Sequence, residues 1–340
     1  MTPSTAAAPK RQESDVYDRQ IRLWGAEAQA KMATTKVLYI HMTGTSSEVL
    51  KNLVLAGIRA SICDNRAFPD EVVDAPIFLL SAQDRTCPTG AEPASKKQKY
   101  GTVAEAMKPV VEELNPLLGE CDIVSTAVSD LSDDFLAQFS IVVASRVSMK
   151  DAVRISKAVT SASGKFYMVD CFGLYGAAAL DLGDKHAFRP EKGKELLDAT
   201  IMEPHVPLET MFQVAIADAT NRFHKTPPAA WIRYRSILEY VEQTQTWPTA
   251  GKAEEFSKLI RSWIEKESPA LLENEHLSEK SLQELAKVAT SEVAPLCAVL
   301  GGVVGNEIIK VISGKGEPAN NTLLLDGMSC KSWTFLVKPK

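Results

Sequence analysis

The turn that follows the apolar run Val37–Ile40 is placed where a phosphate-binding turn would lie. The run is rich in β-forming residues and a helix-like pattern comes after it, so the layout is strand, tight turn and helix. A phosphate-binding turn of this kind has glycines at the spacing G-x-G-x-x-G, because bare backbone amides must approach the phosphate. Here those positions hold His41, Thr43 and Ser46, and only Gly44 remains. We therefore expect this turn not to bind a nucleotide.

The residues around the turn give no second nucleotide site. Thr45 and Glu48 have the spacing of a capping box, so the helix expected over Glu48–Ala56 would be satisfied by its own side chains. The next strand, Ala60–Asp64, ends in an acid that could hold a ribose, but no pyrophosphate turn precedes it, which weighs against an oxidoreductase. The chain has no G-x-x-x-x-G-K-[ST] string, which excludes a P-loop.

Alternating strands and helices must position this turn. Further elements are expected as strands at Cys121–Val128, Phe139–Ser145 and Lys165–Asp170, and as helices at Val103–Leu114 and Lys150–Ala162. This alternation predicts an α/β fold with a doubly wound, mostly parallel, Rossmann-like sheet.

The pattern divides the chain into four segments. Residues 1–14 are small and polar and are expected to be a disordered tail, and 15–175 form the first part of the Rossmann-like domain. Residues 204–288 are helical in pattern and predict an all-helical insertion. Residues 289–340 return to the sheet through an apolar helix and a final strand at Asn321–Gly327. The polar stretch Ser81–Lys99, punctuated by proline and glycine, is expected to be a mobile loop.

Composition limits the possible functions. The 340 residues carry a formal net charge of −5 and no basic face, which argues against a nucleic-acid binder. The 6 cysteines are widely spaced without a C-x-x-C pair, so we expect neither a zinc ribbon nor a disulfide framework, and no metal site is predicted. No signal segment opens the chain and no run approaches the roughly 18 apolar residues of a membrane span. We expect a protein of the nucleus and cytoplasm that binds no membrane.

Three stretches resemble the activating enzymes of ubiquitin-like modifiers, which are related to the bacterial MoeB/ThiF adenylyltransferases. They are YDRQIRLWG at Tyr17–Gly25, LKNLVLAG at Leu50–Gly57, and APLCAVLGGVVGNEIIKVISG at Ala294–Gly314 followed by LLLDG, and the first is highly specific. The resemblance implies a ThiF/MoeB-like adenylation fold in which two homologous halves pair. In that family the active half adenylates the modifier's C-terminal glycine with MgATP, and a cysteine then takes the acyl group as a thioester. The degenerate half is a partner.

This chain resembles the degenerate half. An active half carries a second acid after the ribose strand, whereas here Asp64 is followed by Arg66. The family's active arginine, lysine and magnesium-binding aspartate would align near Ala75, Val103 and Val147. Each lost group would neutralise phosphate charge or hold Mg²⁺, so their loss removes transition-state stabilisation. The resemblance therefore implies that this chain binds no cofactor alone and that MgATP lies in the partner's site.

One residue of the YDR string keeps a functional role by this resemblance. Arg19 would reach from the regulatory half to the ATP γ-phosphate in the partner's site, where a guanidinium gives bidentate hydrogen bonds to phosphate oxygens. The alternative is an ion pair within the chain to Asp15 or Asp18, and we assign that structural role to Arg22.

Other singled-out residues are expected to pack rather than react. Trp24 is expected in the core or the interface. Gly301 and Gly302 each cost about 1 kcal/mol in a helix relative to alanine, so a close helix contact is expected there, across the heterodimer interface or within the chain. Cys171 is the most tempting cysteine for a thioester, but it directly follows a core strand, so packing is favoured.

The resemblance is most specific to the regulatory (Aos-type) half of a SUMO-activating enzyme, because the chain is compact and ends soon after its last helix. Its partners would be the catalytic subunit and, through it, SUMO. The regulatory half of the neddylation-activating enzyme is the alternative within the family, although it is a longer chain. An autonomous adenylyltransferase would need the lost lysine, arginine and aspartates. A pure scaffold would make no use of Arg19.

Overall fold

The computed structural model describes residues 16–68, 77–80, 100–193, 195–220 and 225–340. The predicted tail at 1–14, the predicted loop at 81–99 and the position of Ala75 lie outside the described residues.

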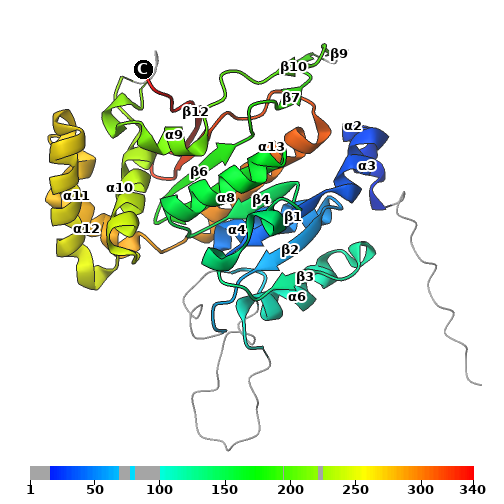
Figure 1. Ribbon diagram of the computed structural model, residues 1–340, viewed down its shortest axis with the longest axis horizontal. Helices are drawn as coiled ribbons and strands as arrows, with labels where there is room; N and C mark the ends of the chain where they lie inside the picture. Colours follow the sequence, from blue (N-terminus) through cyan, green and yellow to red (C-terminus); the bar gives the residue numbers. More distant parts are fainter. Residues whose placement is uncertain (1–15, 69–76, 81–99, 194, 221–224) are drawn as a thin grey trace, which may run out of the picture.

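The described residues form a sheet of 8 strands with helices on both faces (Figure 1). The strand order is β12-β11-β6-β5-β4-β1-β2-β3. The strands of this sheet are β1 Lys36–Ile40, β2 Arg59–Cys63, β3 Asp122–Val124, β4 Ile141–Ala144, β5 Lys165–Phe172, β6 Tyr175–Asp181, β11 Thr322–Asp326 and β12 Lys331–Phe335. The helices are α2 Asp18–Trp24, α3 Ala26–Thr34, α4 Gly44–Leu55, α6 Val103–Leu114, α7 Asp133–Leu136, α8 Met149–Ser161, α9 Leu208–Gln213, α10 Ala229–Thr244, α11 Ala253–Glu267, α12 Glu279–Val288 and α13 Ala294–Ser313.

The strands divide into a parallel and an antiparallel part. Strands β3, β2, β1, β4 and β5 are parallel neighbours, in the order of a doubly wound Rossmann-like sheet. Strands β6, β11 and β12 extend it in antiparallel orientation. The predicted fold class is confirmed. Strands β6 and β12 were not predicted. For β6 the reason is that its run YGAAALD is dominated by alanine and glycine, which are poor strand formers.

The parallel strands β1, β2, β4 and β5 are buried on both faces, whereas β3 at the edge of the sheet is partly exposed. Along β1, Leu38 and Ile40 belong to one hydrophobic cluster, and Val37 and Tyr39 belong to a second. Successive side chains of a strand point to opposite faces, so these two clusters are the cores on the two sides of the sheet. The first core contains residues of α8 and α10, and the second contains residues of α4, α6 and α13.

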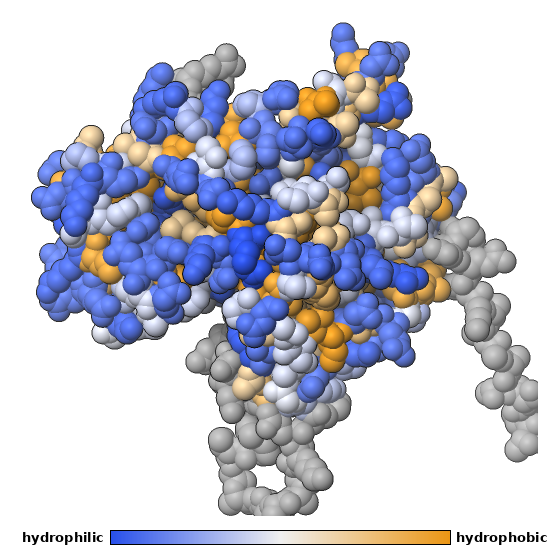
Figure 2. All heavy atoms as spheres, viewed as in Figure 1, coloured by the Kyte–Doolittle hydropathy of each residue, from blue (hydrophilic) through white to orange (hydrophobic). Residues whose placement is uncertain are grey.

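The chain between β6 and α13 is mainly helical. It starts with two short strand pairs, β7 Ala187–Phe188 with β10 Thr200–Ile201, and β8 Glu191–Lys192 with β9 Glu195–Leu196. Helices α9 to α12 follow, and Trp231 of α10 lies in the same core as the sheet. Charged and polar side chains cover α10, α11 and α12 on the face shown in Figure 2. Helix α10 packs its apolar side against β6 and β11 of the sheet, whereas α11 and α12 pack against each other and α11 also contacts α10. The boundaries given for the insertion stay a prediction.

Short 3₁₀ turns join these elements. They lie at Pro116–Leu118, Val128–Asp130, Ile216–Asp218, Ala250–Lys252, Pro269–Leu271 and Glu275–Leu277.

Helix α13 packs along α4 in the second core. By length and hydropathy alone α13 could cross a membrane, so the prediction that no run approaches a membrane span is wrong on these two criteria; 44% of that window is buried inside the structure. An alanine methyl at Gly301 would lie 2.5 Å from Glu48 Cβ and 3.1 Å from the Val49 nitrogen, both in α4. Gly302 is exposed and has no heavy atom within 4 Å of that position. A contact within the chain therefore explains Gly301, and it does not explain Gly302.

The two glycines are expected to respond oppositely to alanine. Gly301→Ala should lower the free energy of unfolding by about 1–3 kcal/mol, because the backbone of α4 would have to move away. Gly302→Ala should raise it by up to about 1 kcal/mol through helix propensity. Urea unfolding of the two variants beside the parent chain measures both changes, and equal effects at the two positions would contradict the close approach of α13 to α4.

Candidate functional site

The turn singled out in the sequence lies at the switch point of the sheet. It follows β1, and the next strand in the sheet on one side is β4. Strands β1 and β4 run parallel and their connections leave in opposite directions along the sheet, to β2 and to β5. Ligands of such sheets bind in the crevice beyond the carboxyl ends of the strands at this point. The chemistry of the site therefore depends on what fills this crevice.

The turn itself keeps its shape without the missing glycines. His41 has a φ of 59°, the left-handed conformation that a glycine would adopt without strain. Thr43 has a φ of −125°, so its β-branched side chain is unstrained. The imidazole of His41 lies near the Arg146 carbonyl, 3.3 Å from Nδ1, and burial lowers the pKa of His41, which favours the neutral ring.

The predicted capping box is wrong in its residues. Helix α4 begins at Gly44, with Thr43 as its N-cap. The Ser46 amide donates to Thr43 Oγ1 at 3.2 Å, and the Thr43 amide donates to Ser46 Oγ at 2.8 Å. Glu48 instead pairs with Lys51 on the side of the helix. The Ser46 hydroxyl accepts the hydrogen bond that the glutamate was expected to accept. The helix therefore begins at Gly44, four residues before the predicted start at Glu48.

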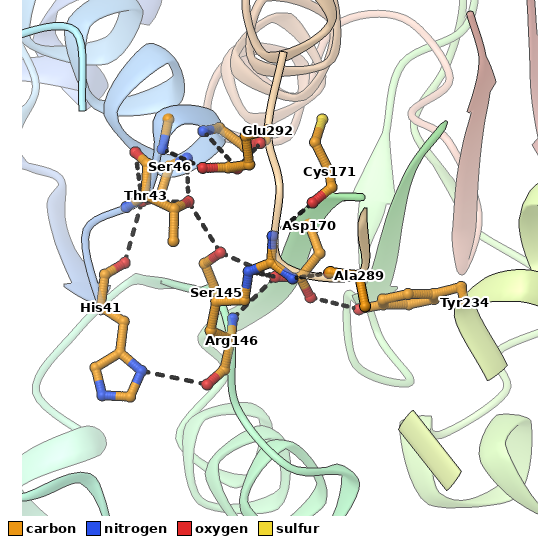
Figure 3. A network of polar contacts seen from close by, with 12 residues as sticks. His41, Thr43, Ser46, Ser145, Arg146, Asp170, Cys171, Tyr234, Ala289 and Glu292 are labelled. Carbon is orange, nitrogen blue, oxygen red and sulfur yellow. Dashed lines mark hydrogen bonds and ion pairs between the residues drawn. The ribbon is translucent and has the colours of Figure 1, made fainter. Parts of the chain in front are cut away.

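A carboxylate of the chain itself lies on the N-terminus of α4. The backbone amides of Gly44 and Thr45 donate to Glu292 at 2.7 and 3.2 Å, and the Thr45 hydroxyl donates to the same carboxylate at 2.7 Å (Figure 3). These donors, at the positive end of the helix dipole, are of the kind that holds a phosphate in a nucleotide site. Glu292 lies 247 residues from Thr45 in the sequence, in the connection between α12 and α13.

The acid at the end of β2 is also engaged. Asp64 is fully buried, and Arg66 donates to it from Nε at 2.9 Å and from Nη2 at 2.6 Å. The Met42 amide donates at 2.7 Å to Oδ2, the carboxylate oxygen that Arg66 Nη2 also contacts. In a ribose site this carboxylate would accept hydrogen bonds from sugar hydroxyls. Here Arg66 of the same chain makes a bidentate contact with this carboxylate instead. The arginine that stands where an active half has its second acid therefore blocks the ribose position.

A second arginine and a buried acid fill the floor of the crevice. Asp170, at 1% exposure, accepts hydrogen bonds from the Ser145 hydroxyl at 3.0 Å, the Arg146 amide at 2.9 Å and the Tyr234 hydroxyl at 2.8 Å (Figure 3). Burial raises the pKa of Asp170, and the charge of Arg146 opposes that rise. The Arg146 guanidinium donates to the carbonyls of Ala289 and Cys171, both at 2.6 Å.

The other lost positions are apolar and buried. Val103 is 0% exposed at the start of α6, and Val147 is 3% exposed beyond β4. Neither can bind phosphate or metal. Across the described residues, no three His, Cys, Asp or Glu side chains gather in a group that could hold a metal ion.

Cys171 lies in the core beside this network. Its contact with Cys297 and its burial hold the pKa of the Cys171 thiol well above the usual range. A thiol that stays protonated and has no access to solvent is a poor nucleophile. The packing role predicted for Cys171 agrees with this environment.

Arg19 lies apart from the network, on α2. Tyr17 and Gln20 attach this helix to the C-terminal end of α4: the Tyr17 hydroxyl accepts from Asn115, which also donates to the Val54 carbonyl, and Gln20 donates to the Leu55 carbonyl. Helix α4 has 12 residues, so at about 1.5 Å per residue its two ends lie about 18 Å apart. Arg19 is therefore remote from the turn at the start of α4.

The ion pair considered for this region belongs to Arg22. Its Nη2 lies 2.9 Å from Asp18 Oδ2, as predicted, and both side chains are exposed. Within residues 16–68 and the other described ranges, Arg19 is exposed and forms no ion pair. Asp15 lies outside those ranges. Trp24 is partly buried against the second core, while its neighbour Leu23 is 73% exposed.

Three relatives align with nearly the whole chain. SUMO-activating enzyme subunit 1B-1 of Arabidopsis thaliana is 30% identical over 320 residues, covering 93% of each chain. SUMO-activating enzyme subunit 1 of Xenopus tropicalis is 29% identical over 358 residues, covering 97% of each, and DNA damage tolerance protein rad31 of Schizosaccharomyces pombe is 27% identical over 326 residues, covering 94% of this chain and 95% of that one. No family model matches the chain.

The resemblance predicted from the YDRQIRLWG string is confirmed by these alignments, and the chain belongs to the SUMO-activating enzyme subunit 1 family.

Proposed function

We propose that this chain is the regulatory, non-adenylating subunit of a SUMO-activating enzyme. It pairs with a catalytic subunit that holds MgATP, adenylates the C-terminus of SUMO and forms the thioester. The observation that carries the proposal is the closed crevice at the switch point. Three side chains of this chain fill the space of a nucleotide. Glu292 lies where a phosphate would bind, Arg66 binds the acid that would hold the ribose, and Arg146 lies below them at the bottom of the crevice. The fold is retained and its ligand space is filled.

Within that complex, we assign Arg19 to the partner's site. Its position at the far end of α4 from this chain's own turn supports a role in trans rather than in cis. Arg22 is held by Asp18, whereas Arg19 is exposed and forms no ion pair within the described ranges. A planar guanidinium can give two hydrogen bonds and a positive charge to the γ-phosphate in the partner's pocket.

The outer face of α13 is the proposed contact with the catalytic subunit. Val299 is 50% exposed and Val303 is 37% exposed, with the open Gly302 between them. Val299 and Val303 border a groove of about 290 Å³ that is also lined by Leu324 of β11 and Trp333 of β12. An exposed groove with an apolar centre and polar residues at its border, here Glu307, Ser332 and Thr334, is typical of subunit interfaces. The relatives are named as subunit 1, which supports the existence of a second subunit.

The proposal includes the cellular location of the protein and the ligand state of the isolated chain. We place it in the nucleus and cytoplasm, with no cofactor bound by the isolated chain. The regulatory half of a neddylation-activating enzyme is less well supported, because the Xenopus and Arabidopsis relatives are named for SUMO.

The experiment that tests this function is SUMO-dependent ATP–pyrophosphate exchange. It is run on the purified chain, on the catalytic subunit that co-purifies with it and is identified by mass, and on their complex. Exchange by the complex but not by this chain alone is expected.

A further inference from the structure

The connection between α12 and α13 closes over the crevice as a strap, residues 289–293. Arg146 donates to the Ala289 carbonyl at 2.6 Å, and the Gly173 amide donates to the Ser291 carbonyl at 2.8 Å. Gly173 has a φ of +60°, and a methyl there would lie 2.9 Å from Val288, the last residue of α12, so the point where the strap begins lies directly against the end of β5. Glu292 then directs its carboxylate onto α4 (Figure 3).

The contacts of Glu292 match the recognition of an oxyanion rather than an ordinary surface ion pair. Its partners are the amides of Gly44 and Thr45 and the Thr45 hydroxyl, and no cation of the described residues forms an ion pair with it. The remaining amides of the first turn are already used, because Ser46 donates to Thr43 Oγ1 and Ser47 to the Thr43 carbonyl. Two amides and one hydroxyl thus converge on one negative group at the positive end of a helix of 12 residues.

We infer that Glu292 is this chain's own anion ligand: its carboxylate occupies an oxyanion site at the start of α4, and its removal opens that site to phosphate. The charge on Glu292 repels a second anion, and its side chain fills the space that the anion would need. The inference rests on the proposed function, in which this chain does not bind nucleotide, and it adds how Glu292 excludes the nucleotide phosphates. It names inorganic phosphate as the simplest ligand of the opened site.

The test is the thermal unfolding of the full chain in sodium phosphate, compared with sodium chloride at equal ionic strength. The parent chain and Glu273→Ala, which removes an exposed carboxylate of the same helical region, should melt at the same temperature in both salts. Glu292→Ala should melt higher in phosphate. With a dissociation constant on the order of 5 mM, about 100 mM phosphate would raise the melting temperature by about 2 °C, and the rise should saturate.

A second variant, Glu292→Gln, and a refolding experiment in phosphate cover the case in which Glu292→Ala does not fold. Glu292→Gln keeps the size and an acceptor without the charge, so its phosphate-specific rise should be smaller than that of Glu292→Ala. If Glu292→Ala does not fold in chloride, phosphate should restore its folding. An equal response of Glu292→Ala to both salts, a failure of phosphate to rescue an unfolded variant, or an equal phosphate response of the parent chain would each overturn the inference. None of these results bears on Arg19, so the proposed function is tested separately.

Discussion

Replacing Arg19 with alanine should leave the complex with the catalytic subunit assembled and slow SUMO adenylation about 100-fold or more. The expected loss follows from the proposed role of Arg19, in which its guanidinium donates hydrogen bonds to the negative charge that develops on the ATP phosphates. Assembly should survive, because Arg19 is exposed on α2 and helix α2 is held to α4 by Tyr17 and Gln20. Pyrophosphate exchange at limiting ATP, with gel filtration of the same preparation, measures both quantities.

The neighbouring arginine provides the matched control. Arg22 is on the same helix and pairs with Asp18 in solvent, so Arg22→Ala should remain close to the parent rate. Arg19→Lys should lie between the two, because lysine keeps the charge but loses the planar bidentate geometry. Parent-like exchange by the Arg19→Ala complex would reduce the chain to a scaffold without a catalytic contribution.

Arg146→Ala should lower the free energy of unfolding by about 3–5 kcal/mol, because it leaves the Asp170 carboxylate buried without its positive neighbour. The same change removes the hydrogen bonds to the Ala289 and Cys171 carbonyls, which hold the strap. Alanine is the right replacement, since position 146 has a φ of 53° and glycine would relieve backbone strain at the same time. Urea or thermal unfolding of the isolated chain measures this change in the free energy of unfolding.

Arg154→Ala is the control that distinguishes the effect of the buried charge from the effect of the lost hydrogen bonds to carbonyls. It donates to the carbonyls of Leu131 and Val128 at 2.8 and 2.6 Å, but its acid neighbour Asp151 is partly exposed. Arg154→Ala should therefore cost only about 1–2 kcal/mol. If Arg146→Ala costs no more than that, the buried pair does not stabilise the fold.

The pH dependence of the Arg146→Ala variant has a definite sign. The pKa of Asp170 is raised in the folded chain by burial, above the value of 3.8 for an ordinary aspartate, and removal of Arg146 should raise it further. A carboxyl whose folded pKa is raised gains stability as pH falls through that pKa and loses it as pH rises. The gap between Arg146→Ala and the parent chain should accordingly narrow as the pH is lowered from 7 toward 4.

The local elements of the fold could be predicted because their signals lie in short windows. Helix α6 occupies the predicted residues Val103–Leu114, and β4 and β5 fall within or next to their predicted runs. The weakness of the turn as a phosphate site was also visible, since glycine is required there for physical reasons. By contrast, YGAAALD has no apolar alternation, and β6 becomes a strand only because β5 and β11 pair with it on both sides.

The contents of the site could not be predicted, because they come together through the fold. Glu292 meets Thr45 across 247 residues, and Tyr234 meets Asp170 across 64 residues. Arg146 had a partial signal, since it follows a predicted strand at the carboxyl edge of the sheet. Nothing in its neighbours indicates that it reaches Ala289 in the strap. The sequence identified which groups a nucleotide site lacks, and the structure identifies which groups replace them.

The central claim is that this chain retains a nucleotide-binding fold without nucleotide chemistry and acts only in a complex. The most direct measurement is SUMO-dependent ATP–pyrophosphate exchange by the purified chain, with the heterodimer as the positive control. We expect robust exchange by the heterodimer and none above background by the chain alone, because Glu292, Arg66 and Arg146 fill its crevice. Robust exchange by the chain alone would contradict it.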